Sequence, residues 1–260
     1  MRPHLRHLFR QGLVAILYKI PVLTVRRHPQ ALRFWGELAR LVYQWAGVAE
    51  VPILDLNALY PGIENQPVVV GFPGSRLSIQ EQVCMAQLLA FRRPKIVFEI
   101  GTAYGGTTVL MAANLSDDAQ ISTLDLPLGC ERRTSCYGPT ITDQELGACF
   151  RGTVHERKIR QLYGDSRFFD FSPWKGQVDL VFIDGGHEYE VVQNDTRKAL
   201  DMISPQGIVV WHDYPSWPGV YRVVHDLART EPIFQIRHTR LALLDTGLRT
   251  NFAGVRRAGQ

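Results

Sequence analysis

The chain has 260 residues, of which 45% are apolar and 21% charged, and its formal net charge is +4. This is the composition of an ordinary globular protein, long enough for one large α/β core with added helices or a lid. Residues 1–40 contain eight basic residues and one acidic residue, a net charge of +7, so the rest of the chain carries −3. A mildly acidic body argues against nucleic acid as a partner.

We expect residues 1–77 to form an N-terminal helical extension, because apolar residues recur at helical spacing within 31–48. Residues 12–23 are the most membrane-like stretch, but Lys19 and Pro21 interrupt it and it is too short to span a bilayer. Two interpretations stay open. The segment is either a basic helix that lies peripherally on an anionic membrane, or a helix that packs on the domain or on a second subunit in a homo-oligomer.

The four cysteines include no C-x-x-C pair and do not have the spacing of a structural zinc site. Reduced thiols are usual in the cytoplasm, so we expect a cytoplasmic protein, held peripherally at the membrane if the basic segment docks there.

A helix over 78–91 comes next, and Ser78 with Glu81 makes a capping box at its start. From residue 95 onwards strands and helices alternate, which predicts an α/β fold with a doubly wound, mostly parallel, seven-stranded sheet. The expected strands are 95–100, 120–126, 158–166, 178–184, 207–214, 233–238 and 241–245, and the expected helices between them are 105–115, 188–203 and 219–230.

One connection breaks this alternation. Residues 127–157, between the second and third of these strands, are rich in glycine, threonine and charged residues and are too long for a plain loop. Long insertions of this kind are often lids, so we expect this one to recognise the substrate. Tyr137 and Glu145 are candidate substrate contacts, although no spacing argument supports either.

A glycine-rich turn follows the first strand of the alternating region. Residues 99–106 read EIGTAYGG, between a strand and a helix, where such a turn brings a nucleotide close to a helix N-terminus. One reading is an imperfect G-x-A-x-x-G dinucleotide fingerprint. The other is E-x-G-x-A-x-G, which resembles the first motif of class I S-adenosylmethionine-dependent methyltransferases. The candidate cofactor residues in this turn are Glu99, Gly101, Ala103, Tyr104 and Gly105.

Two further acidic residues stand at strand ends. Asp125 ends the second strand, where a carboxylate can accept both ribose hydroxyls of S-adenosylmethionine or equally of NAD. Asp165 follows the third strand, where the resemblance to these methyltransferases implies a contact with the adenine amine. Each residue alone could be a turn former. Together with Glu99, in this order, they favour S-adenosylmethionine as the cofactor.

The stretch VDLVFIDGGHEYE, residues 178–190, delivers Asp184 and His187 where a buried strand ends, and ligands bind at such ends in open α/β sheets. His212 and Asp213 follow the next strand. D-G-x-H followed by H-D resembles a branch of the class I methyltransferases that includes macrolide-sugar O-methyltransferases and cephalosporin-hydroxylase-like proteins. The resemblance covers roughly residues 95–230, and it implies that residues 78–260 form an S-adenosylmethionine-binding methyltransferase domain.

The resemblance also implies roles at the reacting end. Asp184, His212 and Asp213 occupy the positions that bind magnesium in metal-dependent members, and His187 takes the position of the base that removes the proton of the acceptor hydroxyl. His212 departs from the family, which has an acidic residue there. Magnesium prefers oxygen ligands, so His212 indicates a softer ion, a neighbour of the ligands rather than a ligand, or a site without metal.

Trp211, Trp217, Tyr214 and Tyr104 either line an apolar acceptor pocket or belong to the core. The function expected is O-methylation of a small, sugar-like or polyhydroxy acceptor, or of a lipid-linked glycan if the N-terminus docks on a membrane. Two alternatives stay open. An NAD-dependent oxidoreductase shares the glycine turn and Asp125 but gives no role to Asp165 or to D-G-x-H. A non-catalytic nucleotide-binding or interaction module would keep the fold without the chemistry.

Overall fold

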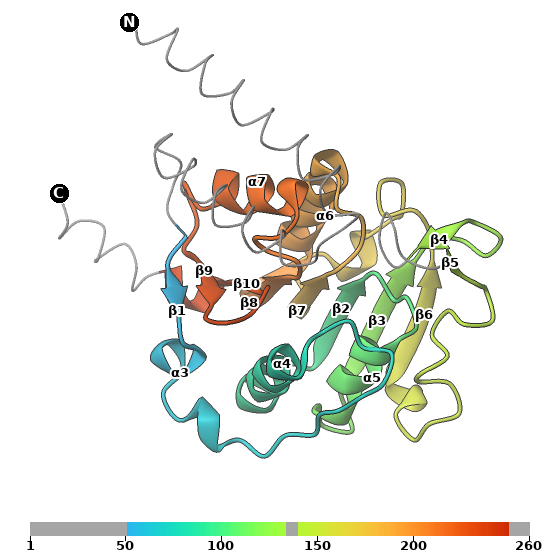
Figure 1. Ribbon diagram of the computed structural model, residues 1–260, viewed down its shortest axis with the longest axis horizontal. Coiled ribbons are helices and arrows are strands. Elements are labelled where there is room, and N and C mark those ends of the chain that lie inside the picture. The colour runs from blue at the N-terminus through green and yellow to red at the C-terminus, as the bar shows by residue number, and fades with distance from the viewer. Residues whose placement is uncertain (1–50, 134–139, 250–260) are drawn as a thin grey trace, which may run out of the picture.

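The computed structural model describes residues 51–133 and 140–249, and a large sheet lies at its centre (Figure 1). Within these ranges the sheet has eight strands in the order β1-β9-β10-β8-β7-β2-β3-β6. Neighbours pair in parallel, except that β10 is antiparallel to β8 and β9. The strands are β1 (Ile53–Leu54), β2 (Ile96–Ile100), β3 (Gln120–Asp125), β6 (Ile159–Tyr163), β7 (Val178–Ile183), β8 (Ile203–Trp211), β9 (Ile233–Ile236) and β10 (Ala242–Asp245). The predicted doubly wound, mostly parallel sheet is confirmed.

Strand β1 is an eighth strand where the sequence predicts seven. Ile53 and Leu54 pair with β9 from within the stretch assigned to the helical extension. Two residues next to a proline carry too little periodicity to be recognised as a strand. The rest of 51–77 contains only the four-residue helix α3 (Leu56–Leu59) and the 3-10 turn η1 (Ile63–Asn65). Residues 1–50, with the membrane and packing hypotheses, lie outside the described residues.

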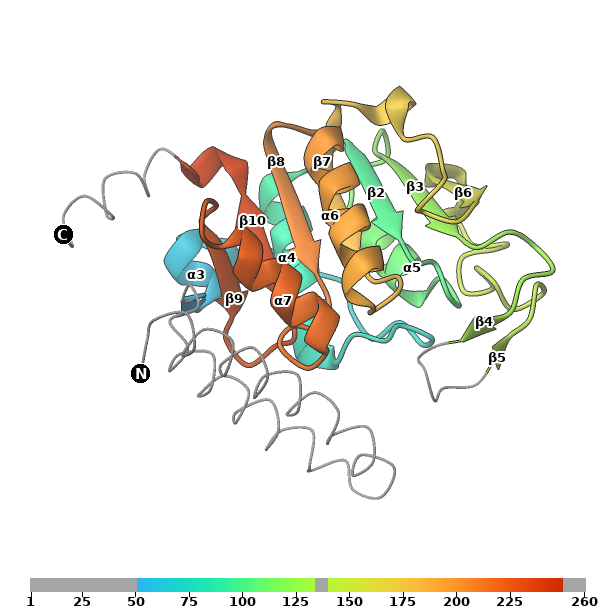
Figure 2. The same ribbon diagram turned by 90° about the horizontal axis from the view of Figure 1, so that it is seen from above.

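Helices cover both faces of the sheet. Helices α6 (Tyr189–Met202) and α7 (Pro218–Leu227) lie on one face, and α4 (Ile79–Arg92) and α5 (Gly106–Ala113) lie on the other (Figures 1 and 2). The predicted capping box starts α4, since the Ser78 hydroxyl accepts from the Glu81 N–H at 3.3 Å and the Glu81 carboxylate accepts from the Ser78 N–H at 2.7 Å. Ile203, the last residue of the expected helix over 188–203, is instead the first residue of β8.

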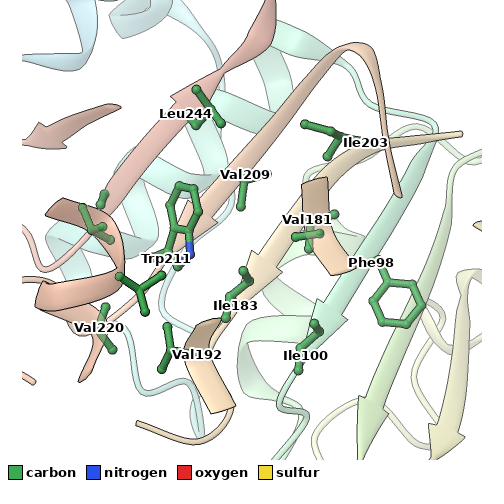
Figure 3. Packing of buried hydrophobic residues seen from close by; sticks show 14 of the residues in the cluster. Phe98, Ile100, Val181, Ile183, Val192, Ile203, Val209, Trp211, Val220 and Leu244 are labelled. Carbon is green, nitrogen blue, oxygen red and sulfur yellow. The ribbon is translucent and has the colours of Figure 1, made fainter. Parts of the chain in front are cut away.

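Two apolar cores result, one on each face. Successive residues of a strand point to opposite faces, and residues 180–183 of β7 follow this rule. In β7, Val181 and Ile183 pack toward α6 and α7, as Figure 3 shows, whereas Leu180 and Phe182 pack toward α4 and α5. Because both faces are covered, such strands are apolar at nearly every position, which is why β7 was recognisable from its sequence.

The long connection between β3 and β6 contains a small hairpin in place of a helix. Its strands are β4 (Arg132–Arg133) and β5 (Thr140–Ile141), and the 3-10 turn η2 (Glu156–Lys158) leads into β6. Backbone hydrogen bonds attach it to the glycine turn, from the Gly147 N–H to the Ala103 carbonyl and from the Cys149 N–H to the Tyr104 carbonyl, both 2.9 Å. The insertion therefore supports the cofactor turn. Tyr137 lies outside the described residues.

Among the helices in the described ranges, none is both long and apolar enough to cross a bilayer.

Candidate active site

A cleft of about 1120 Å³ opens at the carboxyl ends of β2, β3, β6, β7 and β8. Its walls come mainly from the segments that follow these strands, at 100–107, 124–126, 164–167, 184–191 and 212–213. Ligands of open α/β sheets bind beyond this edge. Small-molecule sites have volumes of roughly 300–1,000 Å³, so the cleft can take a nucleoside cofactor together with a small acceptor.

Close backbone packing explains two glycines of the turn between β2 and α5. Gly101 has φ of +105°, and a Cβ there would lie 2.2 Å from the carbonyl oxygen of Asp184. At Gly106, the first residue of α5, a Cβ would lie 2.0 Å from the backbone nitrogen of Ser75. Neither position has room for a side chain, so the turn sits directly against the end of β7 and the loop before α4.

The turn residues divide into two groups. Gly101 and Ala103 line the cleft, as expected for a cofactor site. Tyr104 and Gly105 are not among its lining residues, and both lie against the insertion instead. A Cβ on Gly105 would meet the Phe150 ring at 2.6 Å, and the Tyr104 carbonyl accepts from Cys149. These two residues therefore support the turn through their contacts with the insertion and do not line the cleft.

Glu99 is fully buried beneath the turn and does not line the cleft. One of its carboxylate oxygens accepts from the hydroxyls of Thr108 at 2.5 Å and Thr123 at 2.6 Å, which ties α5 to β3. The other oxygen has no hydrogen-bond partner among the described residues. Burial raises the pKa of Glu99 to about 8, although the two hydroxyls oppose the shift. The structure thus places this predicted cofactor residue in a supporting position.

Asp125 lies on the cleft wall and braces the turn. Its Oδ2 accepts from the backbone N–H groups of Thr102 at 3.1 Å and Ala103 at 2.9 Å. The Arg132 Nε, from the insertion, lies 3.4 Å from Oδ1. A carboxylate held in this way has a fixed orientation at the cofactor end, where the sequence predicts the ribose contact.

Asp165 lines the same end of the cleft. The Arg167 Nη2 donates a hydrogen bond to the Asp165 Oδ2 at 2.5 Å. These hydrogen bonds lower the pKa of Asp165. A third carboxyl group, Asp195 of α6, also lines this wall and was not predicted. Burial raises its pKa to about 6, and its Oδ2 has no hydrogen-bond partner among the described residues. In the sequence Asp195 reads as one polar residue of a helix, which gives no signal of burial.

At the other end, the structure brings Asp184 and His212 together. The His212 Nδ1 lies 3.0 Å from the Asp184 Oδ1, and the His212 side chain is almost fully buried. Burial opposes a charge on this ring, but the charge and hydrogen bond of Asp184, assisted by Glu81 and Asp213, raise the pKa of His212 to about 10. The other ring nitrogen, Nε2, has no hydrogen-bond partner among the described residues.

His187 and Asp213 form a dyad beside this pair. The His187 Nε2 lies 2.7 Å from the Asp213 Oδ2, and the His187 ring stacks on Trp217 with centroids 4.6 Å apart. Asp213 has φ of +62°, an uncommon conformation that turns its carboxylate toward the histidine. Because an ionised carboxylate only accepts, it fixes the proton of the neutral ring on Nε2 and leaves the lone pair on Nδ1.

Two charged residues complete this end of the cleft. Arg240, in the turn between β9 and β10, donates from Nη1 to the Asp213 Oδ1 at 2.6 Å, and its backbone N–H donates to Glu81 at 2.7 Å. Burial would raise the pKa of Glu81, but the His212 ring, 3.7 Å away, and the backbone N–H groups of Ser78 and Arg240 hold that pKa well below its usual range. Sequence reasoning assigned Glu81 only to a helix cap. Arg240 lies 159 residues further along the chain, and no local pattern links the two.

Asp184, His212 and Asp213 each offer a ligand atom within 4.8 Å of the others, close enough for one ion to touch all three. Their chemistry does not fit magnesium. Magnesium takes oxygen ligands in near-octahedral geometry, and a ligating imidazole must be neutral. Here one of the three donors is an imidazole nitrogen rather than an oxygen, and both oxygens of Asp213 also accept hydrogen bonds, from His187 and from Arg240. This donor set favours the alternatives that the sequence left open for His212.

The four aromatic candidates for the acceptor pocket lie in different parts of the structure. Trp217 lines the cleft, and Tyr104 does not. Trp211 and Tyr214 belong to the core on the α6 and α7 face, where the Trp211 indole donates to Thr196 at 2.9 Å. In the insertion, Glu145 accepts from Thr142 and is not among the cleft residues. Only Trp217 of these candidates is placed to meet an acceptor.

The chain is similar to known methyltransferases in sequence over part of its length and in fold. Residues 98–214 match a family model described as a methyltransferase domain. The O-methyltransferase TomG from Streptomyces achromogenes, solved in complex with SAM, aligns with a TM-score of 0.50 and 16% identity over 76% of this chain and 92% of its own. The O-methyltransferase NovP aligns with a TM-score of 0.53 and 16% identity, over 66% and 81%. No curated protein has a significant match to the sequence.

The solved structures share the fold, and the family model spans the glycine turn, Asp125, Asp165 and the D-G-x-H and H-D motifs. The chain therefore has the fold of these O-methyltransferases, and its residues 98–214 match the methyltransferase-domain model, in line with what its motifs predicted.

Proposed function

We propose that this chain transfers a methyl group from S-adenosylmethionine to a hydroxyl group of a small, sugar-like or polyhydroxy acceptor. The observation that carries the proposal is the His187–Asp213 dyad, which shares one cleft with the glycine turn and the acidic residues of the cofactor end. The methyl donor and the base can then lie in the same cleft. TomG and NovP, which share the fold, are O-methyltransferases.

At the cofactor end, Gly101 and Ala103 let a nucleoside approach the backbone, and Asp125 offers an oxygen to the ribose hydroxyls. Asp165 is the candidate partner of the adenine amine, on the far wall of the same end. The N-terminus of α5 adds a partial positive charge that suits the carboxylate of the methionine part. The solved TomG structure contains SAM, in line with this assignment.

The reaction is a direct displacement at the methyl carbon. The acceptor oxygen forms the new C–O bond while the C–S bond breaks, and S-adenosylhomocysteine leaves as a neutral thioether. The hydroxyl proton passes to His187 Nδ1, because Nε2 donates to Asp213. Asp213 then stabilises the imidazolium, and stacking on Trp217 holds the ring in place.

The lining of the cleft favours a polar acceptor. Besides the dyad, the cleft walls carry Arg76, Glu131, Glu188 and Glu190, and Trp217 provides one aromatic surface. Hydroxyl groups can both donate to carboxylates and accept from a guanidinium, and a sugar ring can lie on an indole face. A polyhydroxy acceptor satisfies more of these groups than an apolar one.

Calorimetric titration of the full chain with S-adenosylmethionine and with NAD tests the cofactor. Formation of S-adenosylhomocysteine with a panel of sugars and polyhydroxy compounds then tests the reaction. His187→Gln should keep cofactor affinity and lose transfer by about a hundredfold or more, the usual contribution of a general base. His155→Ala, a histidine outside the cleft, is the control. Binding of NAD in place of S-adenosylmethionine, or full activity of His187→Gln, would refute the proposal.

A further inference from the structure

Arg240 connects three separate elements at the reacting end. Its guanidinium bonds to Asp213 after β8 at 2.6 Å, and its Nε lies 3.3 Å from Glu81 of α4. Its backbone is anchored as well, since the N–H donates to Glu81 at 2.7 Å and the carbonyl accepts from the Tyr214 N–H at 3.1 Å. Two contacts of the guanidinium and two of the backbone thus hold Arg240 in one position, although 39% of the side chain is exposed.

The Arg240 guanidinium lies beside a cluster of negative charges. Three carboxylates, Glu81, Asp184 and Asp213, converge here around the His212 ring, and carboxylates at such close quarters repel one another. In metal-dependent enzymes a divalent ion compensates such groups. Arginine stays charged at every accessible pH and binds a carboxylate with fixed geometry, so it can compensate them permanently.

The contact between Arg240 and Asp213 also affects His187, the proposed base. Asp213 uses one oxygen for Arg240 and the other for His187, so the orientation of its carboxylate determines the orientation of the histidine ring. A metal ion on the first oxygen would lie within a few ångströms of the guanidinium charge. Repulsion between the two cations therefore opposes metal binding at this oxygen while Arg240 holds it.

We propose that Arg240 takes the place of the divalent cation of metal-dependent relatives, so that the methyl transfer proposed above needs no metal. Arg240 is a positioning residue, because it acts on the reaction through Asp213 and His187 rather than by touching the acceptor. The inference rests on the proposed function for its catalytic part. Its metal-binding part stands on the geometry alone.

Binding of Mn²⁺, measured by the electron paramagnetic resonance signal of the free ion, tests the metal-binding part on the full chain without any acceptor. Wild type should bind no Mn²⁺ at millimolar concentration. Arg240→Gln should bind it, because the substitution frees the Asp213 oxygen and removes the positive charge that Glu81 and Asp213 share. Arg240→Lys keeps the charge and should not bind. Arg237→Gln is the matched control, since Arg237 has similar exposure and pairs with Asp55 outside the cleft.

Methyl transfer, with any acceptor that the panel yields, tests the positioning role. Wild-type activity should be insensitive to EDTA. Arg240→Gln should lose about tenfold or more in kcat, Arg240→Lys should lose less, and millimolar Mn²⁺ should restore part of the activity of Arg240→Gln only. A purely structural role for Arg240 would not produce this selective rescue. Circular dichroism spectra and thermal unfolding of each variant report whether it is folded.

Three results would overturn the inference: stoichiometric Mn²⁺ binding by wild type that Asp184→Asn abolishes, loss of wild-type activity in EDTA, or no Mn²⁺ binding by a folded Arg240→Gln variant. None of the metal-binding results depends on the cofactor. Failure of S-adenosylmethionine to bind would refute the proposed function and leave the metal-binding test unaffected, so the two failures are distinguishable.

Discussion

Glu99 should make the folded protein less stable as the pH rises, and Glu99→Gln should remove this dependence. The carboxyl group is fully buried under the glycine turn, with its hydrogen bonds limited to two threonine hydroxyls on one oxygen. Glutamine has nearly the same shape and keeps an oxygen that can accept both hydroxyls. The substitution therefore removes the ionisation while preserving the contacts between α5 and β3.

The magnitude follows from the two pKa values. Burial raises the pKa of Glu99 from the ordinary 4.5 to about 8 in the folded chain. The folded state then binds more protons than the unfolded state between these values, so stability falls as the pH rises from 4.5 to about 8 and stays lower above it. At about 1.4 kcal/mol per pKa unit, the full effect is roughly 5 kcal/mol, an upper limit because the surroundings relax.

Urea unfolding at a series of pH values measures this effect. At acidic pH, wild type should be as stable as Glu99→Gln or slightly more stable, because the amide nitrogen gains no partner. Above the folded-state pKa, the variant should be the more stable protein by up to several kcal/mol. Glu64→Gln, at an exposed position, controls for the general effect of removing a carboxylate. Parallel stability curves for wild type and Glu99→Gln across this range would refute the reasoning.

Three further predictions concern the cleft. Gly101→Ala places a Cβ 2.2 Å from the Asp184 carbonyl oxygen, so it should lower the free energy of unfolding by roughly 1–3 kcal/mol and weaken S-adenosylmethionine binding in calorimetry. Trp217→Ala removes the ring that stacks on His187, and it should slow transfer about tenfold with unchanged cofactor affinity; an equal loss of affinity would contradict this role. Because burial raises the pKa of Asp195 from 3.8 to about 6, wild type should lose stability as the pH rises between these values. Asp195→Asn should remove this contribution, which thermal unfolding at a series of pH values measures.

The fold class was predictable because its signals are local. Strand β7 is apolar at nearly every position since both of its faces are covered, and the capping box of Ser78 and Glu81 marks the start of α4 within four residues. The motifs at the strand ends were readable for a related reason. Parallel strands place their carboxyl ends at one edge, so Asp125, Asp165 and Asp184 had to lie near one another.

The rest depends on contacts between residues far apart in the chain. Glu99 lies in the motif expected to bind the cofactor, but its side chain points to the face of β2 that α5 covers. There it accepts hydrogen bonds from Thr108 and Thr123. The short strand β1 exists only because β9 offers it an edge. Propensity and spacing contain no information on such pairings, because the stabilisation comes from the partner and not from the segment itself.

The sequence by itself determined the class of fold, the edge of the sheet where the site lies, and most of the residue types there. Only the tertiary structure decided the chemistry of the reacting end. It brings Arg240 from the last turn of the sheet and Glu81 from a helix cap to the same carboxylates, and it fills both oxygens of Asp213. The physical reason is that charge compensation acts through space over a few ångströms, regardless of separation along the chain.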